Sequence, residues 1–198
     1  MASNIFDKLE LAAFKAGITP RTKESREWFR VKAQAMGRNI NRTKLMKEEP
    51  LERRSRTVMG RMYMFFYDPK LRETLPYYDA FPLVIVVRPA PGGFYGLNLH
   101  YLPPILRAKL LDGLIEIADT KKGEDSKFRL TYQLLKGTSK LKWFKPCFKH
   151  YLTAHVQSKF AEVKPPEWEI ATFLPTAQFR KAKKGEIYKD SRDIIRNA

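Results

Sequence analysis

The stretch Tyr63–Pro104 limits the possible folds more than any other part of the chain. It contains seven of the 13 prolines and has almost no helical periodicity. At 63–67, Tyr63, Phe65 and Tyr67 alternate with Met64 and Phe66, and residues 94–101 alternate around Gly96 and Asn98. Residues 83–87 form an unbroken apolar run. Alternation and short apolar runs between turn residues are typical of β-strands. The sequence therefore predicts three strands here.

The segments between these strands indicate how the strands are connected. Asp68-Pro69-Lys70 is a turn signature, residues 71–82 form a long aromatic-rich connection, and 89–93 read as a hairpin turn. Such connections are typical of small SH3-like barrels, but a further strand needed for closure has no clear position. We therefore expect an α+β fold: a small antiparallel sheet or partial SH3-like barrel surrounded by helices, with basic N- and C-terminal extensions.

Helical spacing of apolar residues recurs on both sides of the predicted sheet. Ser3 or Asn4 is the expected cap of the first helix, and Ser25 that of the second. The helix after Pro103-Pro104 is apolar on a wide arc and is expected to be buried. The predicted helices cover residues 4–16, 22 to a break at Gly37, 104–118, 128–136 and 146–156.

Charge divides the chain into three parts. Residues 1–56 carry 14 Lys or Arg against 7 Asp or Glu, residues 57–119 carry 6 against 6, and residues 120–198 carry 18 against 8. The net charges are thus +7, 0 and +10. We predict three segments: a basic helical arm and linker (1–57), an α+β core domain (58–175) and a basic C-terminal tail (176–198), mostly exposed, with a terminal helical turn at 193–196.

The net charge of +17 and the pI near 10 indicate a polyanionic partner, an acidic protein or an anionic surface, and nucleic acid is the commonest of these. A solvated basic surface without a partner is the alternative. The single cysteine, Cys147, excludes an internal disulfide and a multi-cysteine zinc site, and is expected to be a small buried hydrophobe. No run approaches the roughly 20 apolar residues that span a bilayer, so no membrane association is expected.

Three groups of basic residues are candidates for phosphate contacts. The first lies before the first strand, the second is interleaved with aromatic residues that could stack on bases, and the third lies in the tail. In the second group the aromatic residues could equally belong to the core, with the lysines as their solvated side. The candidates are Arg53, Arg54 and Arg56; Lys140, Lys142, Trp143, Lys145 and Lys149; and Arg180, Lys181, Lys183 and Lys184.

No motif supports an enzyme or a cofactor. Gly92-Gly93 lacks the Lys-Ser/Thr of a phosphate-binding loop, and His150 and His155 miss the i,i+4 spacing of a helical metal site. Cys147 and His150 could touch on a helix, but no group that would orient them is evident. A metal-dependent nuclease needs clustered carboxylates, and the only candidates near the core, Asp68, Asp79 and Asp112, each have a structural interpretation. We predict no catalytic residue, metal or cofactor.

The phrases MYMFFYDPK, LPYYDAFPL, GFYGLNLHYLPP, RLTYQLLK and WFKPCFKHYLTAHVQSKF resemble a family of small virion-associated proteins of T4-like tailed phages, the DNA end protectors. The resemblance covers roughly residues 58–175. It implies a non-enzymatic protein of the virion, present in the host cytoplasm during assembly, that binds the ends of packaged DNA and shields them from exonuclease. It supplies no residue roles.

The alternative hypothesis is a structural neck, tail or baseplate component that docks on neighbouring virion subunits. Long termini on a small core suit such a role, because arms can reach adjacent chains. DNA, other virion proteins or both are the expected partners, and oligomerisation within the particle is left open.

Overall fold

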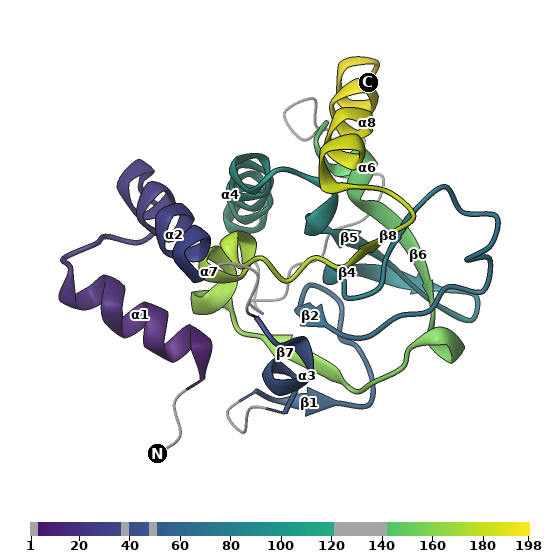
Figure 1. The fold of residues 1–198 in the computed structure, drawn as a ribbon, viewed down its shortest axis with the longest axis horizontal. Coiled ribbons are helices and arrows are strands. Elements are labelled where there is room, and N and C mark those ends of the chain that lie inside the picture. The colour runs from purple at the N-terminus through teal and green to yellow at the C-terminus, as the bar shows by residue number, and fades with distance from the viewer. Residues whose placement is uncertain (1–3, 37–39, 48–50, 121–141) are drawn as a thin grey trace.

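The computed structural model describes residues 4–36, 40–47, 51–120 and 142–198, and Figure 1 shows an open sheet with helices beside it. All the neighbouring strands of this six-stranded sheet are antiparallel, in the order β1-β7-β2-β4-β5-β6. A separate pair joins β3 to β8. The strands are β1 (Arg53–Arg54), β2 (Met62–Met64), β3 (Tyr78–Asp79), β4 (Leu83–Ala90), β5 (Gly93–Asn98), β6 (Phe148–Leu152), β7 (Phe160–Val163) and β8 (Phe179–Arg180).

The three predicted strands are present as β2, β4 and β5. The β4–β5 hairpin closes through Pro91 and Gly92, with Ala90 opposite Gly93. Gly92 has φ +70°, a left-handed conformation that glycine adopts without steric cost. The third strand is shorter than expected, because Leu99–Tyr101 form a 3-10 turn (η1).

The prediction of a helix over residues 146–156 is wrong. A single helical turn, α6 (Phe144–Cys147), leads directly into β6, and a 3-10 turn, η3 (Thr153–His155), separates β6 from β7. Pairing of β6 with β5 and of β7 with β2 satisfies these backbone groups across the sheet instead of along a helix. The segment therefore supplies β6, a strand that the sequence could not place, and β7 follows it.

The sheet is strongly curved but not closed, and an SH3-like barrel is not found. Phe94 on β5 and Phe160 on β7 lie three strands apart, about 14 Å in a flat sheet, yet their ring centroids are 5.9 Å apart. Phe65, whose ring centroid is 5.0 Å from that of Phe160, fills the concave face between them. The other face carries Met64, Ile85 and alternate neighbours into the main core.

Helices cover that second face. Apolar residues of α4, α7 and the N-terminal helices join those of the sheet in one core cluster, and Figure 1 shows α1, α2, α4 and α7 grouped together beside the sheet. The helices are α1 (Ile5–Lys15), α2 (Lys23–Met36), α3 (Arg42–Leu45), α4 (Pro104–Thr120), α7 (Trp168–Phe173), preceded by the 3-10 turn η4 (Pro165–Glu167), and α8 (Lys184–Arg196).

The helix starts follow the capping expectations in one case and not in the other. Asn4 caps α1 by accepting from the Asp7 backbone N–H at 2.8 Å, as the sequence predicts. For α2 the cap is Thr22, whose hydroxyl accepts from the Ser25 backbone N–H at 3.0 Å. Ser25 is therefore the third helical residue, and its hydroxyl donates to Glu169 on α7. The expected break at Gly37 and the expected helix over 128–136 lie outside the described residues.

Most of the C-terminal residues are exposed, but they are not a tail with a single helical turn. Residues 179–180 pair with β3, and α8 runs from Lys184 to Arg196. Ile187, Ser191 and Ile195 are buried at four-residue spacing, and the Ser191 hydroxyl donates to the Tyr101 carbonyl at 2.7 Å. These contacts hold α8 against η1 and the core.

Candidate nucleic-acid interface

The first predicted basic group lies on and after β1, at one edge of the sheet. Arg53 and Arg56 are exposed, in agreement with a surface role. Arg54 instead forms ion pairs with Glu52 and with the buried Glu162 of β7. Its charge is therefore largely compensated within the protein, and its side chain holds β1 against β7.

The second group is divided between surface and core. Lys140 lies outside the described residues, and Lys142 and Lys145 are exposed. Trp143 packs against the main core, the alternative that the sequence left open. Lys149 places its Nζ 4.2 Å from the ring centroid of Tyr101, and burial lowers the pKa of its ammonium. The described members therefore do not form one exposed stacking surface.

The third group flanks β8 and begins α8. The Lys181 Nζ donates to the Glu73 carbonyl at 2.7 Å, which fixes this residue to the loop before β3. Lys183 is exposed and precedes the first turn of α8. The side chains of Arg180 and Lys184 are exposed. Within the described part of the chain, neither side chain has a hydrogen-bond or ion-pair partner. Their charges remain uncompensated.

Two arginines that the sequence analysis did not select approach Lys184. Arg42 on α3 donates from Nε to the Thr176 carbonyl at 2.7 Å and from Nη2 to the Ala177 carbonyl at 2.9 Å. Arg107 on α4 is buried, with 3% of its surface exposed. Arg107 lies in a helix that the sequence predicts to be buried, and this was a usable signal because buried charges are rare. Nothing in the sequence around Arg42 pointed to it.

Arg107 uses its guanidinium to tie together several segments through neutral acceptors. It donates to the carbonyls of Leu102, Thr172 and His100 at 2.7, 3.0 and 3.3 Å, and to the Tyr188 hydroxyl at 2.9 Å. These bonds satisfy its donors without neutralising its charge. Among the residues with described positions, no carboxylate pairs with Arg107.

These side chains line a hollow of about 370 Å³ between α2, α3, α4 and the start of α8, which we call the basic hollow. Its charged lining residues are Arg30, Arg42, Arg107 and Lys184, and none of the Asp and Glu residues with described positions lines it. Arg30 is paired with Glu27 on the surface of α2, but the other three cations have no such partner among the described residues.

A second hollow, of about 270 Å³, shows the opposite arrangement. Arg26 there is ion-paired with Asp112, and Glu169 accepts hydrogen bonds from the Arg21 backbone N–H and the Ser25 hydroxyl. Its lining thus carries both signs of charge, and Arg26 and Glu169 have partners within the protein. The basic hollow differs from this second hollow in that three of its cations have no ion-pair partner among the described residues.

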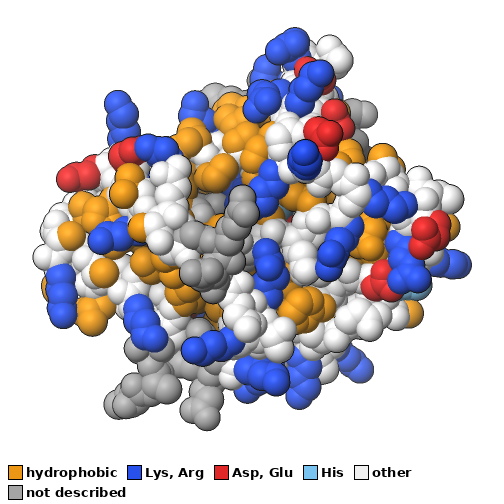
Figure 2. Space-filling model, viewed as in Figure 1, with side chains coloured by type: hydrophobic (Ala, Val, Ile, Leu, Met, Phe, Trp, Pro, Cys, Tyr) orange, Lys and Arg blue, Asp and Glu red, His pale blue; other side chains and the backbone are white. Residues whose placement is uncertain are grey.

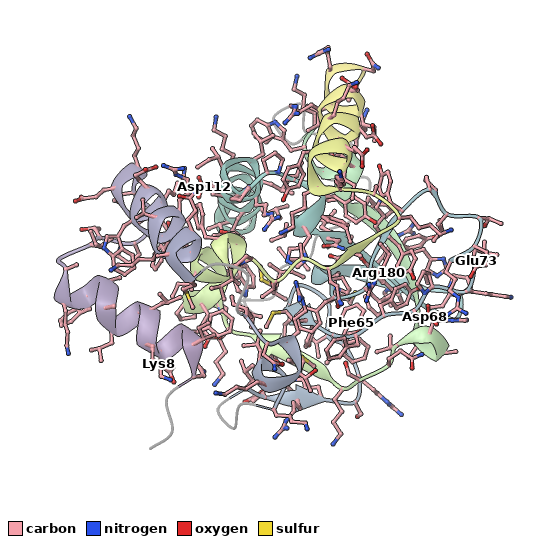
Figure 3. All side chains as sticks on the ribbon, viewed as in Figure 1. Lys8, Phe65, Asp68, Glu73, Asp112 and Arg180 are labelled. Atoms are coloured by element: carbon pink, nitrogen blue, oxygen red, sulfur yellow. The ribbon has the colours of Figure 1, made fainter. Side chains whose placement is uncertain are left out.

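The surface around these residues is basic as well. Figure 2 shows Lys and Arg side chains over most of the visible face, whereas the Asp and Glu side chains gather toward its upper and right-hand margins. Figure 3 places Arg180 on β8, near the middle of the same view. The described Asp and Glu side chains in this view lie away from its centre, where the described charged side chains are Lys and Arg.

A buried polar network supports the floor beside the basic hollow. The Asp79 carboxylate lies 2.7 Å from the His100 Nδ1, and the His100 Nε2 lies 3.0 Å from the Thr176 hydroxyl. Asp79 also accepts from the Asn98 side chain and from the backbone N–H groups of Phe81 and Gln178. The network thus joins β3, β5 and the segment whose carbonyls hold Arg42.

The order Asp, His, Thr is that of a nucleophilic triad, but the burial excludes this role. Asp79, His100 and Thr176 have exposed fractions of 3%, 0% and 1%, so a substrate cannot reach the hydroxyl. Burial lowers the pKa of His100 against the opposing effect of Asp79. Burial would raise the pKa of Asp79, but its hydrogen bonds and His100 outweigh this and lower it. A neutral His100 that donates to a charged Asp79 and accepts from Thr176 satisfies all three groups.

This network makes stability depend on pH. The folded-state pKa of His100 is below its ordinary value of 6.5, so the unfolded state binds the proton more readily than the folded state. The free energy of unfolding therefore falls as the pH drops below that value. We expect the free energy of unfolding to decrease between pH 7 and pH 5 with a slope of up to about 1.4 kcal/mol per pH unit. Urea unfolding at several pH values measures it. His100→Gln should flatten the slope, and His150→Gln, at an exposed site, should not.

The described residues do not assemble a catalytic or metal site. Asp68 pairs with Arg72, Asp112 pairs with Arg26, and Asp79 is enclosed. Figure 3 shows Asp112 and Asp68 on opposite sides of the molecule. No group of three potential metal ligands occurs within 4–36, 40–47, 51–120 and 142–198.

The thiol of Cys147 has no catalytic surroundings either. It is buried at the end of α6, as predicted, and burial raises its pKa to about 12. His150 belongs to β6 and not to the same helix, so the predicted helical proximity of the two side chains is absent. In the part of the chain that the structure describes, no helix is long and apolar enough to cross a membrane.

The fold and the basic hollow define a compact α+β protein suited to binding an anion at its surface. The chain belongs to the family of the phage T4 terminal DNA protecting protein, whose model matches residues 7–197. This confirms the resemblance to the DNA end protectors and extends it from the core to almost the whole chain. Searches of curated proteins and of solved structures found no match.

Proposed function

We propose that this protein binds the ends of duplex DNA through phosphate contacts and shields them from exonucleases, without catalysing a reaction. The observation that carries the proposal is the set of uncompensated cations around the basic hollow, in a chain of a family described as terminal DNA protecting. A bound protein occupies the end that an exonuclease must engage. Protection therefore needs affinity and position but no reactive group.

The overall charge supports the same function. A net charge of +17 favours phosphate contacts that release condensed counterions from DNA. Arg53, Arg56, Lys142 and Lys145 are exposed and available for such contacts. In this proposal they supply binding that is independent of sequence, whereas the basic hollow distinguishes an end from the rest of the duplex.

Binding to DNA should weaken steeply with salt. With about six phosphate contacts, affinity should fall about a thousandfold between 50 and 200 mM salt. Fluorescence anisotropy with a short blunt duplex measures this, and closed circular DNA as competitor tests for end preference. Absence of binding at low salt, or affinity unchanged by salt, contradicts the proposal.

A structural role at the neck, tail or baseplate is the second candidate, and one observation favours it. Phe14 and Leu11 on α1 have exposed fractions of 80% and 54%, which is unusual for large apolar side chains outside an interface. They could dock on a neighbouring virion subunit.

A virion reconstruction distinguishes the candidates: a fixed ring of copies away from DNA favours docking, and density at a DNA end favours protection. Both candidates place the protein in the virion, and in the host cytoplasm during assembly.

A further inference from the structure

We propose that the basic hollow is a binding site for the terminal phosphate of a DNA strand. This inference rests on the proposed function and makes it more specific, because it assigns end recognition to one group of residues. The site combines Lys184, Arg42 and Arg107, which come from α8, α3 and α4.

Lys184 is the residue whose surroundings most clearly favour the binding of an anion. Within the described chain, its ammonium has no hydrogen-bond or ion-pair partner. Its side chain is exposed, but desolvation by the surrounding protein lowers its pKa, and the positive charges of Arg107 and Arg42 lower it further. An anion placed among the three would relieve this repulsion. Two arginines beside a lysine disfavour its charged form, so this arrangement does not serve solubility alone.

The two arginines are held in place before any ligand binds. Arg42 is fixed by the carbonyls of Thr176 and Ala177, and Arg107 by three carbonyls and the Tyr188 hydroxyl. The negative charge of Asp79 acts to raise the pKa of Arg42 and of Lys184. This carboxylate is buried, however, and accepts four hydrogen bonds from other groups. Preorganised donors lose little conformational freedom on binding.

The composition of the hollow favours a phosphate attached to a sugar over a free ion. Its volume of about 370 Å³ exceeds the roughly 30 Å³ share of one water molecule many times. Pro104, Phe173, Leu174 and Pro175 form an apolar part of the lining beside the cations. Such a wall can pack against a terminal sugar or base while the cations bind the phosphate.

Charge distinguishes a terminal phosphate from the phosphates inside a strand. A phosphate monoester carries about −1.5 to −2 at neutral pH, whereas a backbone phosphodiester carries −1 and is linked on both sides. Three uncompensated cations therefore attract the monoester more strongly. The hollow provides a physical basis for preferring an end over the continuous duplex.

Lys184→Glu is the decisive variant. Lys184 is the first residue of α8, where a negative side chain interacts favourably with the helix dipole, so the fold should be retained. Lys189→Glu is the matched control, because this exposed lysine lies on the same helix, does not line the hollow and changes the net charge equally. Thermal unfolding followed by circular dichroism confirms that both variants are folded.

The probes are blunt duplexes of one sequence with 5′-phosphate, 3′-phosphate or only hydroxyl ends, compared by fluorescence anisotropy. The native protein should prefer one phosphorylated duplex by about tenfold. Lys184→Glu should lose that preference, and Lys189→Glu should keep it. Equal binding of all three duplexes by the native protein overturns the hollow as the site but leaves DNA binding intact. A preference that survives in Lys184→Glu overturns it too. No binding at any salt concentration instead rejects the proposed function.

Discussion

Gly93→Ala is expected to destabilise the protein by about 3 kcal/mol or more. Gly93 begins β5 and lies opposite Leu152 of β6. A Cβ atom added there would lie well under 3.0 Å from the Tyr151 carbonyl oxygen, and 2.9 Å from the carbonyl carbon. Because this obstacle is backbone, no side-chain rotation relieves it. The β5–β6 pairing must shift, and the aromatic cluster that includes Tyr151 must shift with it.

Gly185→Ala provides the matched control for this prediction. Nothing lies within 4 Å of a Cβ added at Gly185, which is in the first turn of α8. Alanine has the higher helix propensity, so this variant should gain up to about 1 kcal/mol. Urea unfolding of both variants measures the difference. Similar stabilities for the two would contradict the close approach of β6 to Gly93.

Asp79→Ala is the second substitution with a large expected effect. It leaves a buried imidazole, a buried amide and two backbone N–H groups without their acceptor. Removing one partner from a buried charged network costs about 3–5 kcal/mol. We expect a large loss in the free energy of unfolding, together with loosening of the segment at Thr176. Chemical denaturation and tryptophan fluorescence measure both effects.

Asp68→Ala is the control for this variant and also tests the nuclease alternative. Asp68 is half-exposed, and its pair with Arg72 should contribute less than about 1 kcal/mol. A loss of DNA cleavage in Asp79→Ala would be ambiguous, because that variant is expected to unfold. Magnesium-dependent cleavage by the native protein that disappears in Asp68→Ala would contradict a non-enzymatic role. An Asp79→Ala protein as stable as the native one would contradict the network.

The central strands could be predicted because their local pattern and their tertiary environment agree. Met62–Met64, Leu83–Ala90 and Gly93–Asn98 alternate or run apolar, and both faces of their sheet are buried. The sequence predicts a helix over 146–156, where Pro146 stands at a position that proline tolerates in the first turn of a helix. The segment forms a strand because β5 offers it an open edge, and a partner remote in sequence leaves no local signal.

The candidate site was only partly predictable, for a related reason. The cluster around Lys184 was visible because no apolar stripe surrounds it in the sequence. The basic hollow needs Arg42 and Arg107 as well, and these approach Lys184 only through the contacts of Thr176, Ala177 and Tyr188. In α8, the spacing of Ile187, Ser191 and Ile195 could have indicated a packed helix. The many charged residues between them obscured it.

The late position of α8 in the chain has a consequence for synthesis. A ribosome releases Arg42 and Arg107 well before Lys184 and Tyr188 are made. Before the C-terminal segment is made, Arg42 lacks the Thr176 and Ala177 carbonyls, and Arg107 lacks the Thr172 carbonyl and the Tyr188 hydroxyl. A nascent chain therefore holds both arginines less firmly. Only a chain translated through α8 can assemble the basic hollow. Under the proposed function, partly translated copies would bind DNA without preferring its ends.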